Sequence, residues 1–168
     1  ELIGRFGAKV HLFDPSPTGA ATISRVQPCA GLWFHPVGLA GQDGDIAFGR
    51  PENSAEGSYR FVAGSGTKAL SFACRRLSTW LRERGVDKIS LLKIDIEGLE
   101  YEVLPDLIAA GYQPRQIAVE FHHFMPGFSR IQTLRTVWML HVAGYFLTAK
   151  HRQDYLFVRL GTDFTDVI

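Results

Sequence analysis

Residues 91–98 read Leu-Leu-Lys-Ile-Asp-Ile-Glu-Gly, an apolar run that changes into a pair of carboxylates. In a strand, alternation would put Lys93, Asp95 and Glu97 on one face. A strand covered by helices on both faces could not hold three charges in its middle. We therefore predict that the strand ends near Asp95, so that Asp95 and Glu97 emerge at its carboxyl edge. Gly98 then opens a helix whose N-terminus favours their negative charge. An ion pair with Lys93 that serves only stability is the alternative.

Short apolar runs on both sides of this stretch predict further strands. The predicted single strands span residues 8–13, 32–39 (irregular at Pro36), 89–94 and 116–121. Two antiparallel hairpins are predicted at 44–62, around the turn-rich GRPENSAEG, and at 145–160.

Helical patterns alternate with these strands. They predict a helix over 18–26, a helix that Ser78 caps and Gly85 ends, and a helix over 99–108 that Pro105 kinks or restarts. A last amphipathic helix is marked by Ile131, Leu134, Trp138 and Val142. The alternation predicts an α/β fold, a doubly wound and mostly parallel sheet in one domain over residues 1–168.

Composition excludes several classes of protein. Hydrophobic residues make up 46% of the chain and charged residues 21%, and 18 basic residues balance 17 acidic ones. A net charge of +1 predicts no nucleic-acid partner and no anionic membrane surface. Two cysteines, Cys29 and Cys74, cannot build a disulfide framework, so we expect a reducing, cytoplasmic location. No apolar run approaches the roughly 20 residues that span a bilayer.

Asp14 follows the first predicted strand within the sequence Phe13-Asp14-Pro15. A carboxylate at such a strand end can accept hydrogen bonds from the vicinal hydroxyls of a ribose. Asp before Pro is also common at the start of a turn. The residues alone favour neither interpretation.

Polar residues also gather at the end of the strand over 116–121. They are Glu120, His122 and His123. If this strand neighbours the one that ends at Asp95, Glu120 and His122 converge with Asp95 on one pocket. His122 or His123 could then act as a general base. Asp95, Glu120 and His122 could together bind a metal, but no recognisable ligand motif supports such a site. We therefore predict no metal.

Taken together, these residues resemble the FkbM family of methyltransferases. The strongest match runs from Leu92 through Glu100 to Leu104, close to the family signature LKIDxEGxExxVL. The Phe13–Pro15 strand end, the Glu120–His122 strand tip and the closing hairpin also fit. The resemblance covers roughly residues 7 to 160.

The resemblance implies a class I methyltransferase that uses S-adenosyl-L-methionine. Asp14 would hold the ribose of the donor, and Gly38 and Leu39 would lie near its adenine. Asp95 and Glu97 would face the methionine part of the donor and the acceptor. Positioning would supply much of the rate, and a base such as His122 would help where a hydroxyl must lose its proton.

One departure from the family pattern concerns the beginning of the chain. The first strand of the fold and its glycine-rich donor loop should precede residues 2–6, and we expect both to be missing here. The 168-residue chain alone is therefore expected to be inactive, and the domain N-terminally incomplete.

The predicted function is O-methylation of a hydroxyl on a small molecule or sugar. One alternative is a binding domain that keeps the methyltransferase fold without catalysis, and another is a nicotinamide-dependent oxidoreductase. The acceptor is expected to meet the loops at 49–57 and 124–130, whose residues do not identify it. The sequence indicates no oligomeric state.

Overall fold

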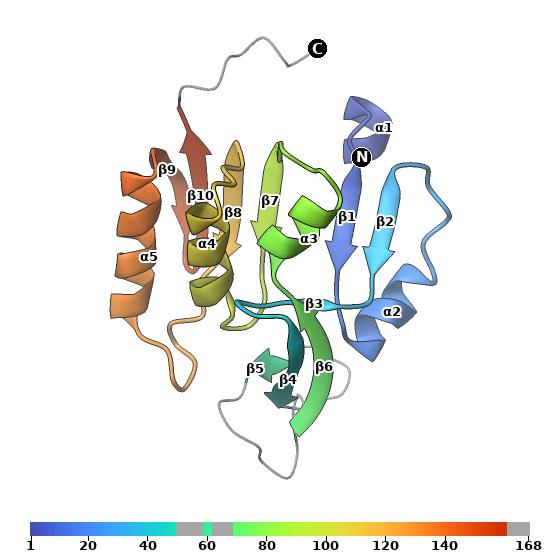
Figure 1. Cartoon of the computed structure of the whole chain (residues 1–168), viewed down its shortest axis with the longest axis horizontal. Helices are drawn as coiled ribbons and strands as arrows, with labels where there is room; N and C mark the ends of the chain where they lie inside the picture. Colours follow the sequence, from blue (N-terminus) through green and yellow to red (C-terminus); the bar gives the residue numbers. More distant parts are fainter. Residues whose placement is uncertain (50–58, 62–68, 161–168) are drawn as a thin grey trace. The chain divides into compact units, whose positions relative to one another are not determined.

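The computed structural model describes residues 1–49, 59–61 and 69–160. The chain divides into two compact units, Glu1–Arg75 and Arg76–Ile168, and each is described here by itself. Figure 1 labels their helices and strands. Each unit holds parallel and antiparallel strand pairs, which confirms the mixed α/β class. A single doubly wound sheet stays a prediction.

The first unit begins with a parallel strand pair. After α1 (Leu2–Phe6), β1 (Val10–Phe13) runs parallel to β2 (Leu32–His35). The intervening helix is α2 (Pro17–Ile23), whose N-cap Ser16 accepts a hydrogen bond from the Gly19 N–H at 2.9 Å. Pro17 suits the first helical position because its missing N–H would have had no partner there.

A second sheet in this unit has the order β3-β6-β4-β5. Its strands are β3 (Gly38–Leu39), β4 (Gly44–Gly49), β5 (Arg60–Phe61) and β6 (Ala69–Arg75). The predicted hairpin is confirmed where Phe48 faces Phe61, while residues 50–58 and 62 lie outside the described part. Strand β6 was not predicted from the sequence.

The prediction of one strand over residues 32–39 is wrong. Pro36 has no N–H for a ladder hydrogen bond, and it separates β2 from β3. The two strands belong to different sheets, since β2 pairs with β1 and β3 pairs in parallel with β6.

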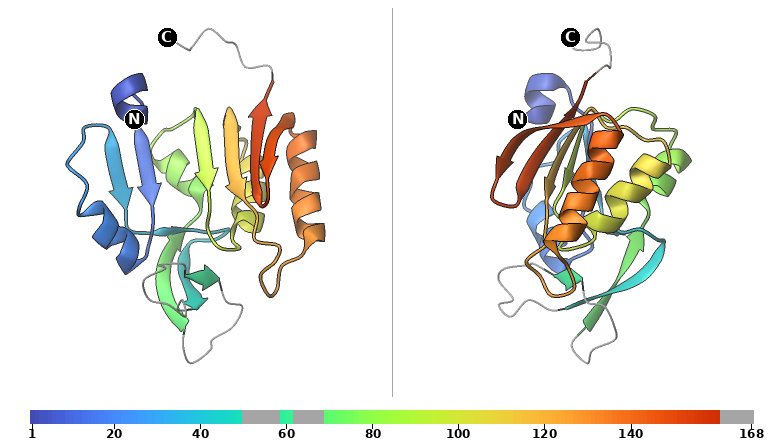
Figure 2. Two further views of the ribbon diagram at one scale, coloured as in Figure 1. Left: turned by 180° about the vertical axis from the view of Figure 1, so that it is seen from behind. Right: turned by 90° about the vertical axis from the view of Figure 1, so that its left-hand side faces the viewer.

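The second unit holds a four-stranded sheet in the order β7-β8-β10-β9. Its strands are β7 (Leu91–Ile94), β8 (Gln116–Glu120), β9 (Tyr145–His151) and β10 (Asp154–Arg159). The predicted closing hairpin is confirmed, because β9 and β10 pair antiparallel. The right view of Figure 2 shows α4 (Glu100–Ala109) and α5 (Arg130–Val142) on one face of this sheet.

Helix α4 supplies much of the core of the second unit. Val103, Leu104 and Leu107 are at most 1% exposed and share one helix face. The helix is continuous through Pro105 and does not restart there, while the predicted kink stays a prediction. A proline removes one helical hydrogen bond, and we attribute the continuity to the buried leucines on either side of it.

Helix α3 (Leu77–Glu83) begins one residue before the predicted cap. Its N-cap is Arg76, which makes no side-chain cap. Ser78 instead donates its hydroxyl hydrogen to Asp106 of α4 over 2.5 Å, and Arg76 pairs with the same carboxylate. The predicted Ser78 cap is therefore wrong, because this hydroxyl ties two helices together.

Helix α5 exposes the apolar stripe that predicted it. Its four residues are between 61% and 69% exposed, although such a stripe ordinarily faces a core: Ile131, Leu134, Trp138 and Val142. The buried side chains are Thr133, Thr136 and Leu140. No helix in the described part of the chain is long and apolar enough to cross a membrane.

Candidate functional site

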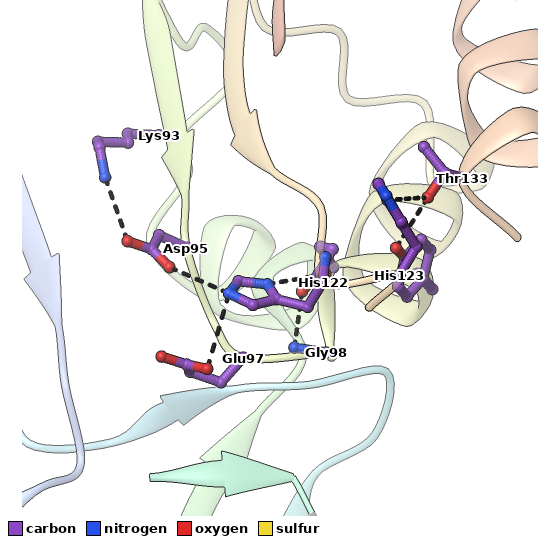
Figure 3. Close-up of polar contacts among 9 residues, drawn as sticks. Lys93, Asp95, Glu97, Gly98, His122, His123 and Thr133 are labelled. Atoms are coloured by element: carbon purple, nitrogen blue, oxygen red, sulfur yellow. Dashed lines mark hydrogen bonds and ion pairs between the residues drawn. The ribbon is translucent and has the colours of Figure 1, made fainter. Parts of the chain in front are cut away.

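Two neighbouring strand ends build the candidate site. Strands β7 and β8 are parallel and in register, with Ile94 opposite Val119. Their carboxyl ends therefore lie at the same edge of the sheet. Asp95 directly follows β7, and His122 follows β8 by two residues. The predicted convergence of Asp95 and His122 is confirmed, because Asp95 Oδ1 lies 3.8 Å from His122 Nε2 (Figure 3).

The turn after β7 brings Glu97 to the same imidazole. Glu97 has φ 53°, the left-handed conformation that side chains rarely adopt, at a cost of about 1–3 kcal/mol. Gly98 has φ 111°, and a Cβ there would meet the Phe128 ring at 2.5 Å. This backbone places Glu97 Oε2 3.6 Å from His122 Nε2. A strained glutamate that contacts a buried histidine is typical of a functional site.

Glu100 holds His122 from the other side. Its carboxylate is fully buried and accepts three hydrogen bonds. The Gly98 N–H donates at 2.9 Å, the His122 backbone N–H at 2.7 Å and His122 Nδ1 at 3.0 Å. Because a carboxylate only accepts, Nδ1 carries the ring hydrogen. In the neutral ring Nε2 then has a free lone pair, directed at Asp95 and Glu97.

His122 is the buried centre of this cluster, with a side chain 4% exposed. Burial alone lowers its pKa, but the hydrogen bond to Glu100 and the charges of Glu100, Glu97 and Glu120 outweigh burial and raise the pKa above 6.5. Lys93 Nζ lies 3.7 Å from Asp95 Oδ2, and both side chains are exposed. The predicted Lys93 pair is therefore present, on the outer side of Asp95.

The structure separates the roles of the two adjacent histidines. His123 Nδ1 lies 3.3 Å from the Thr133 hydroxyl of α5, which also contacts the Tyr101 hydroxyl at 2.9 Å. His123 thus contacts α5, and Thr133 of α5 in turn reaches Tyr101 of α4, whereas His122 meets the carboxylates (Figure 3). Burial raises the pKa of Tyr101 to about 12, so this hydroxyl keeps its hydrogen at neutral pH.

Glu120 stands beside the cluster. It is half-buried, and burial together with the charges of Asp95, Asp154 and Glu97 raises its pKa. It lines a cavity of about 300 Å³ on the sheet with Lys93, Lys150 and Tyr155. The three groups whose ligand atoms lie together are Asp95, Glu97 and His122, so Glu97 replaces Glu120 in the group predicted to converge.

Glu100 is the residue of this site that was not predicted from the sequence. It lies on the same face of α4 as Val103, Leu104 and Leu107, where a charged side chain needs a partner. That position in an apolar stripe is the signal that could have identified it. The partner His122 lies 22 residues away and could not be deduced from spacing.

In the first unit, Asp14 organises the turn after β1. Its Oδ1 accepts a hydrogen bond from the Ser16 N–H at 2.8 Å. A Cβ on Gly19 would overlap the Asp14 carboxylate, so α2 begins against this side chain. The turn interpretation is confirmed, and the ribose role stays a prediction.

Gly38 and Leu39 form the short buried strand β3. A Cβ on Gly38 would meet Cys74 Sγ at 2.6 Å and Pro15 Cγ at 3.4 Å, which requires glycine for packing. This places β3 next to the turn that follows β1. A role near the adenine stays a prediction for both residues.

Comparison with known proteins identifies the family. A family model of the methyltransferase FkbM domain matches residues 7–155. The chain belongs to this family. The resemblance drawn from residues 92–104 is thereby confirmed, and the chain carries a methyltransferase domain. No solved structure gives a significant match.

Two curated relatives of this FkbM domain are each named probable methyltransferase-like protein 24. The rat (Rattus norvegicus) protein is 32% identical over 124 residues, and the human (Homo sapiens) protein is 29% identical over 126 residues. Each match covers 73% of this chain and 28% of the relative. The chain therefore spans little more than a quarter of the length of these relatives.

Proposed function

We propose that the full-length protein transfers a methyl group from S-adenosyl-L-methionine to a hydroxyl oxygen of a small molecule or sugar. The observation that carries the proposal is the imidazole of His122, held by Glu100 with its Nε2 lone pair directed at Asp95 and Glu97. A hydroxyl must give up its proton to become a good nucleophile, and this cluster is suited to promote that loss.

Taken separately, each unit offers a group that such a donor can use. Asp14 uses one lone pair of its carboxylate on Ser16, so several acceptor positions remain for ribose hydroxyls. Asp95 is 41% exposed and offers negative charge to a cationic group. The donor supplies a methyl group on a positively charged sulfur, which the acceptor oxygen attacks as the carbon–sulfur bond breaks.

The chain's own residues then prepare the acceptor. Glu100 fixes the ring orientation and the tautomer of His122. Asp95 and Glu97 provide the negative charge that favours proton removal from the hydroxyl towards Nε2. The lone pair on Nε2 can serve in two ways, by accepting the proton directly or by binding a cation that makes the hydroxyl more acidic.

Binding calorimetry on the full-length protein tests the proposal. S-adenosylhomocysteine should bind with a dissociation constant in the micromolar range, which corresponds to about −8 kcal/mol. The dinucleotide NAD⁺ should show no measurable binding under the same conditions. Binding of NAD⁺ without S-adenosylhomocysteine would favour an oxidoreductase, and binding of neither would favour a non-catalytic domain.

A further inference from the structure

Three potential ligand atoms meet at the ends of β7 and β8. They are Asp95 Oδ1, Glu97 Oε2 and His122 Nε2, and the ligand atoms of these three residues lie within 4.8 Å of one another. A metal held at about 2.1 Å separates adjacent octahedral ligands by about 3.0 Å and opposite ones by about 4.2 Å. The distances from Nε2 to the two oxygens, 3.8 and 3.6 Å, lie inside this range.

These distances are too long for hydrogen bonds, whose usual N···O range ends near 3.2 Å. With the ring hydrogen on Nδ1, the neutral His122 presents a lone pair to two carboxylate oxygens. Three electron-rich atoms that face one another need a positive charge between them, which either a second ring proton on Nε2 or a bound cation can supply. Lys93 lies against Asp95 Oδ2, whereas His122 faces Oδ1 of that carboxylate, and the lysine side chain is 72% exposed.

The residue that orients His122 towards the cluster is already in place. Histidine ligands ordinarily donate their other ring N–H to a carboxylate or carbonyl, which fixes the ring and makes the ligand nitrogen more basic. Glu100 does this for His122, and it is itself fully buried and fixed by the Gly98 N–H. His122, with a side chain more than nine-tenths buried, is thereby aimed at the two carboxylates.

We propose that Asp95, Glu97 and His122 bind one divalent first-row cation of the Mn²⁺ or Zn²⁺ type. An imidazole with two carboxylates suits these ions, whereas Mg²⁺ and Ca²⁺ prefer oxygen ligands throughout. Three protein ligands leave coordination positions open, as in catalytic metal sites. The sequence alone predicted no metal site. The structure supports one because the turn at Gly98 brings Glu97 next to Asp95 and His122.

The role of the cation rests on the proposed function. A hydroxyl oxygen of the acceptor would occupy an open position and become more acidic there. Its proton leaves to solvent, and the oxygen forms the new carbon–oxygen bond. The carbon–sulfur bond breaks with its electron pair on sulfur, which becomes a neutral thioether. Nε2 then serves as a ligand of the cation, and the proton goes to water.

The test uses the full-length protein after treatment with a chelator. Titration with MnCl₂ and with ZnCl₂, followed by calorimetry and by electron paramagnetic resonance for Mn²⁺, should show one site per chain. Glu97→Gln and His122→Gln should each weaken binding at least tenfold, about 1.4 kcal/mol. Glu102→Gln removes a neighbouring exposed charge on α4 and is the matched control, for which no change is expected.

Absence of a site, or binding that Glu97→Gln leaves unchanged, would overturn the inference. Circular dichroism shows whether a variant is folded, and Asp95→Asn provides a third, more exposed ligand position. Methyl transfer that persists unchanged in metal-free protein would reject the cation and leave the proposed methyltransferase intact. Metal binding in a protein that does not bind S-adenosylhomocysteine would reject the proposed function instead.

Discussion

Glu100 Oε1 accepts hydrogen bonds from both the backbone N–H and the ring Nδ1 of His122, at 2.7 and 3.0 Å. One carboxylate oxygen thus fixes the position and the tautomer of the imidazole. A fully buried charge would be costly without such partners. Substitution of Glu100 or His122 is therefore expected to change the stability or the activity of the protein.

Glu100→Gln tests whether this relationship matters for activity. A glutamine amide can present its NH₂ group to Nδ1, and the ring then carries its hydrogen on Nε2, which blocks the lone pair. Turnover should fall at least about tenfold, and metal affinity should fall by about 10–100-fold. Nitrogen-15 NMR of the histidine rings reports the tautomer. Glu102→Gln is the matched control, and turnover within twofold of wild type would exclude a positioning role.

Asp14 variants test the ribose prediction. Asp14→Ala should weaken S-adenosylhomocysteine binding by about 1.5–3 kcal/mol, the scale of hydrogen bonds to a charged group. It should also lower stability by about 1 kcal/mol, because the Ser16 N–H loses its acceptor.

Asp14→Asn separates these two effects. The amide oxygen still accepts from Ser16, so thermal stability should stay near wild type. The charge is lost, so donor affinity should still fall. If calorimetry shows unchanged affinity in both variants, Asp14 serves the turn alone.

Asp95→Asn distinguishes a functional carboxylate from a structural ion pair. Lys93 and Asp95 are 72% and 41% exposed, and such surface pairs contribute about 0–1 kcal/mol. The variant should therefore keep its melting temperature and lose turnover. Lys93→Gln breaks the same pair and should keep both. Equal effects of the two substitutions on stability, with full activity in each, would assign the pair to structure.

Asp106 predicts a pH dependence of stability. Partial burial works to raise its pKa, but hydrogen bonds from Arg76 and Ser78 outweigh burial and hold the pKa below 3.8. The stabilisation is therefore present above about pH 4, and it is lost as the pH falls through the folded-state pKa. Asp106→Asn should lower the free energy of unfolding by about 1–2 kcal/mol at pH 7.

Urea denaturation between pH 3 and pH 7 checks this expectation. The difference between wild type and Asp106→Asn should begin to shrink as the pH falls below about 4, because protonation of the Asp106 carboxyl removes its charge. A difference that does not change with pH would show that the carboxylate charge contributes nothing to the contact between α3 and α4.

Local sequence patterns predicted where helices and strands lie better than they predicted which face of each element is buried. The strand that ends near Asp95 and the closing hairpin are confirmed, because an apolar run that meets charge has few structural solutions. The apolar stripe correctly predicted helix α5, but it did not predict that Trp138 and the rest of the stripe are exposed. The opposite face is buried instead, because the hydroxyl of Thr133 contacts the hydroxyl of Tyr101.

The candidate site was predicted in part for a similar reason. Asp95, Glu97 and His122 follow from strand ends, which the sequence displays. The contact between Glu100 and His122 depends on how α4 packs beside β8, and the bend at Glu97 depends on a left-handed backbone. Neither can be deduced from residue spacing. Residues 50–57, predicted to meet the acceptor, lie outside the described part of the chain.

Transfer of a labelled methyl group tests the proposed O-methylation. The full-length protein is incubated with S-adenosylmethionine carrying a tritiated methyl group and with a panel of sugars and small hydroxylated compounds. We predict label in an ether linkage of at least one compound, with one S-adenosylhomocysteine formed for each methyl transferred. The rate in His122→Gln should be lower by at least about tenfold. Transfer at an unchanged rate in His122→Gln, or no transfer by a protein that binds S-adenosylhomocysteine, would contradict this prediction.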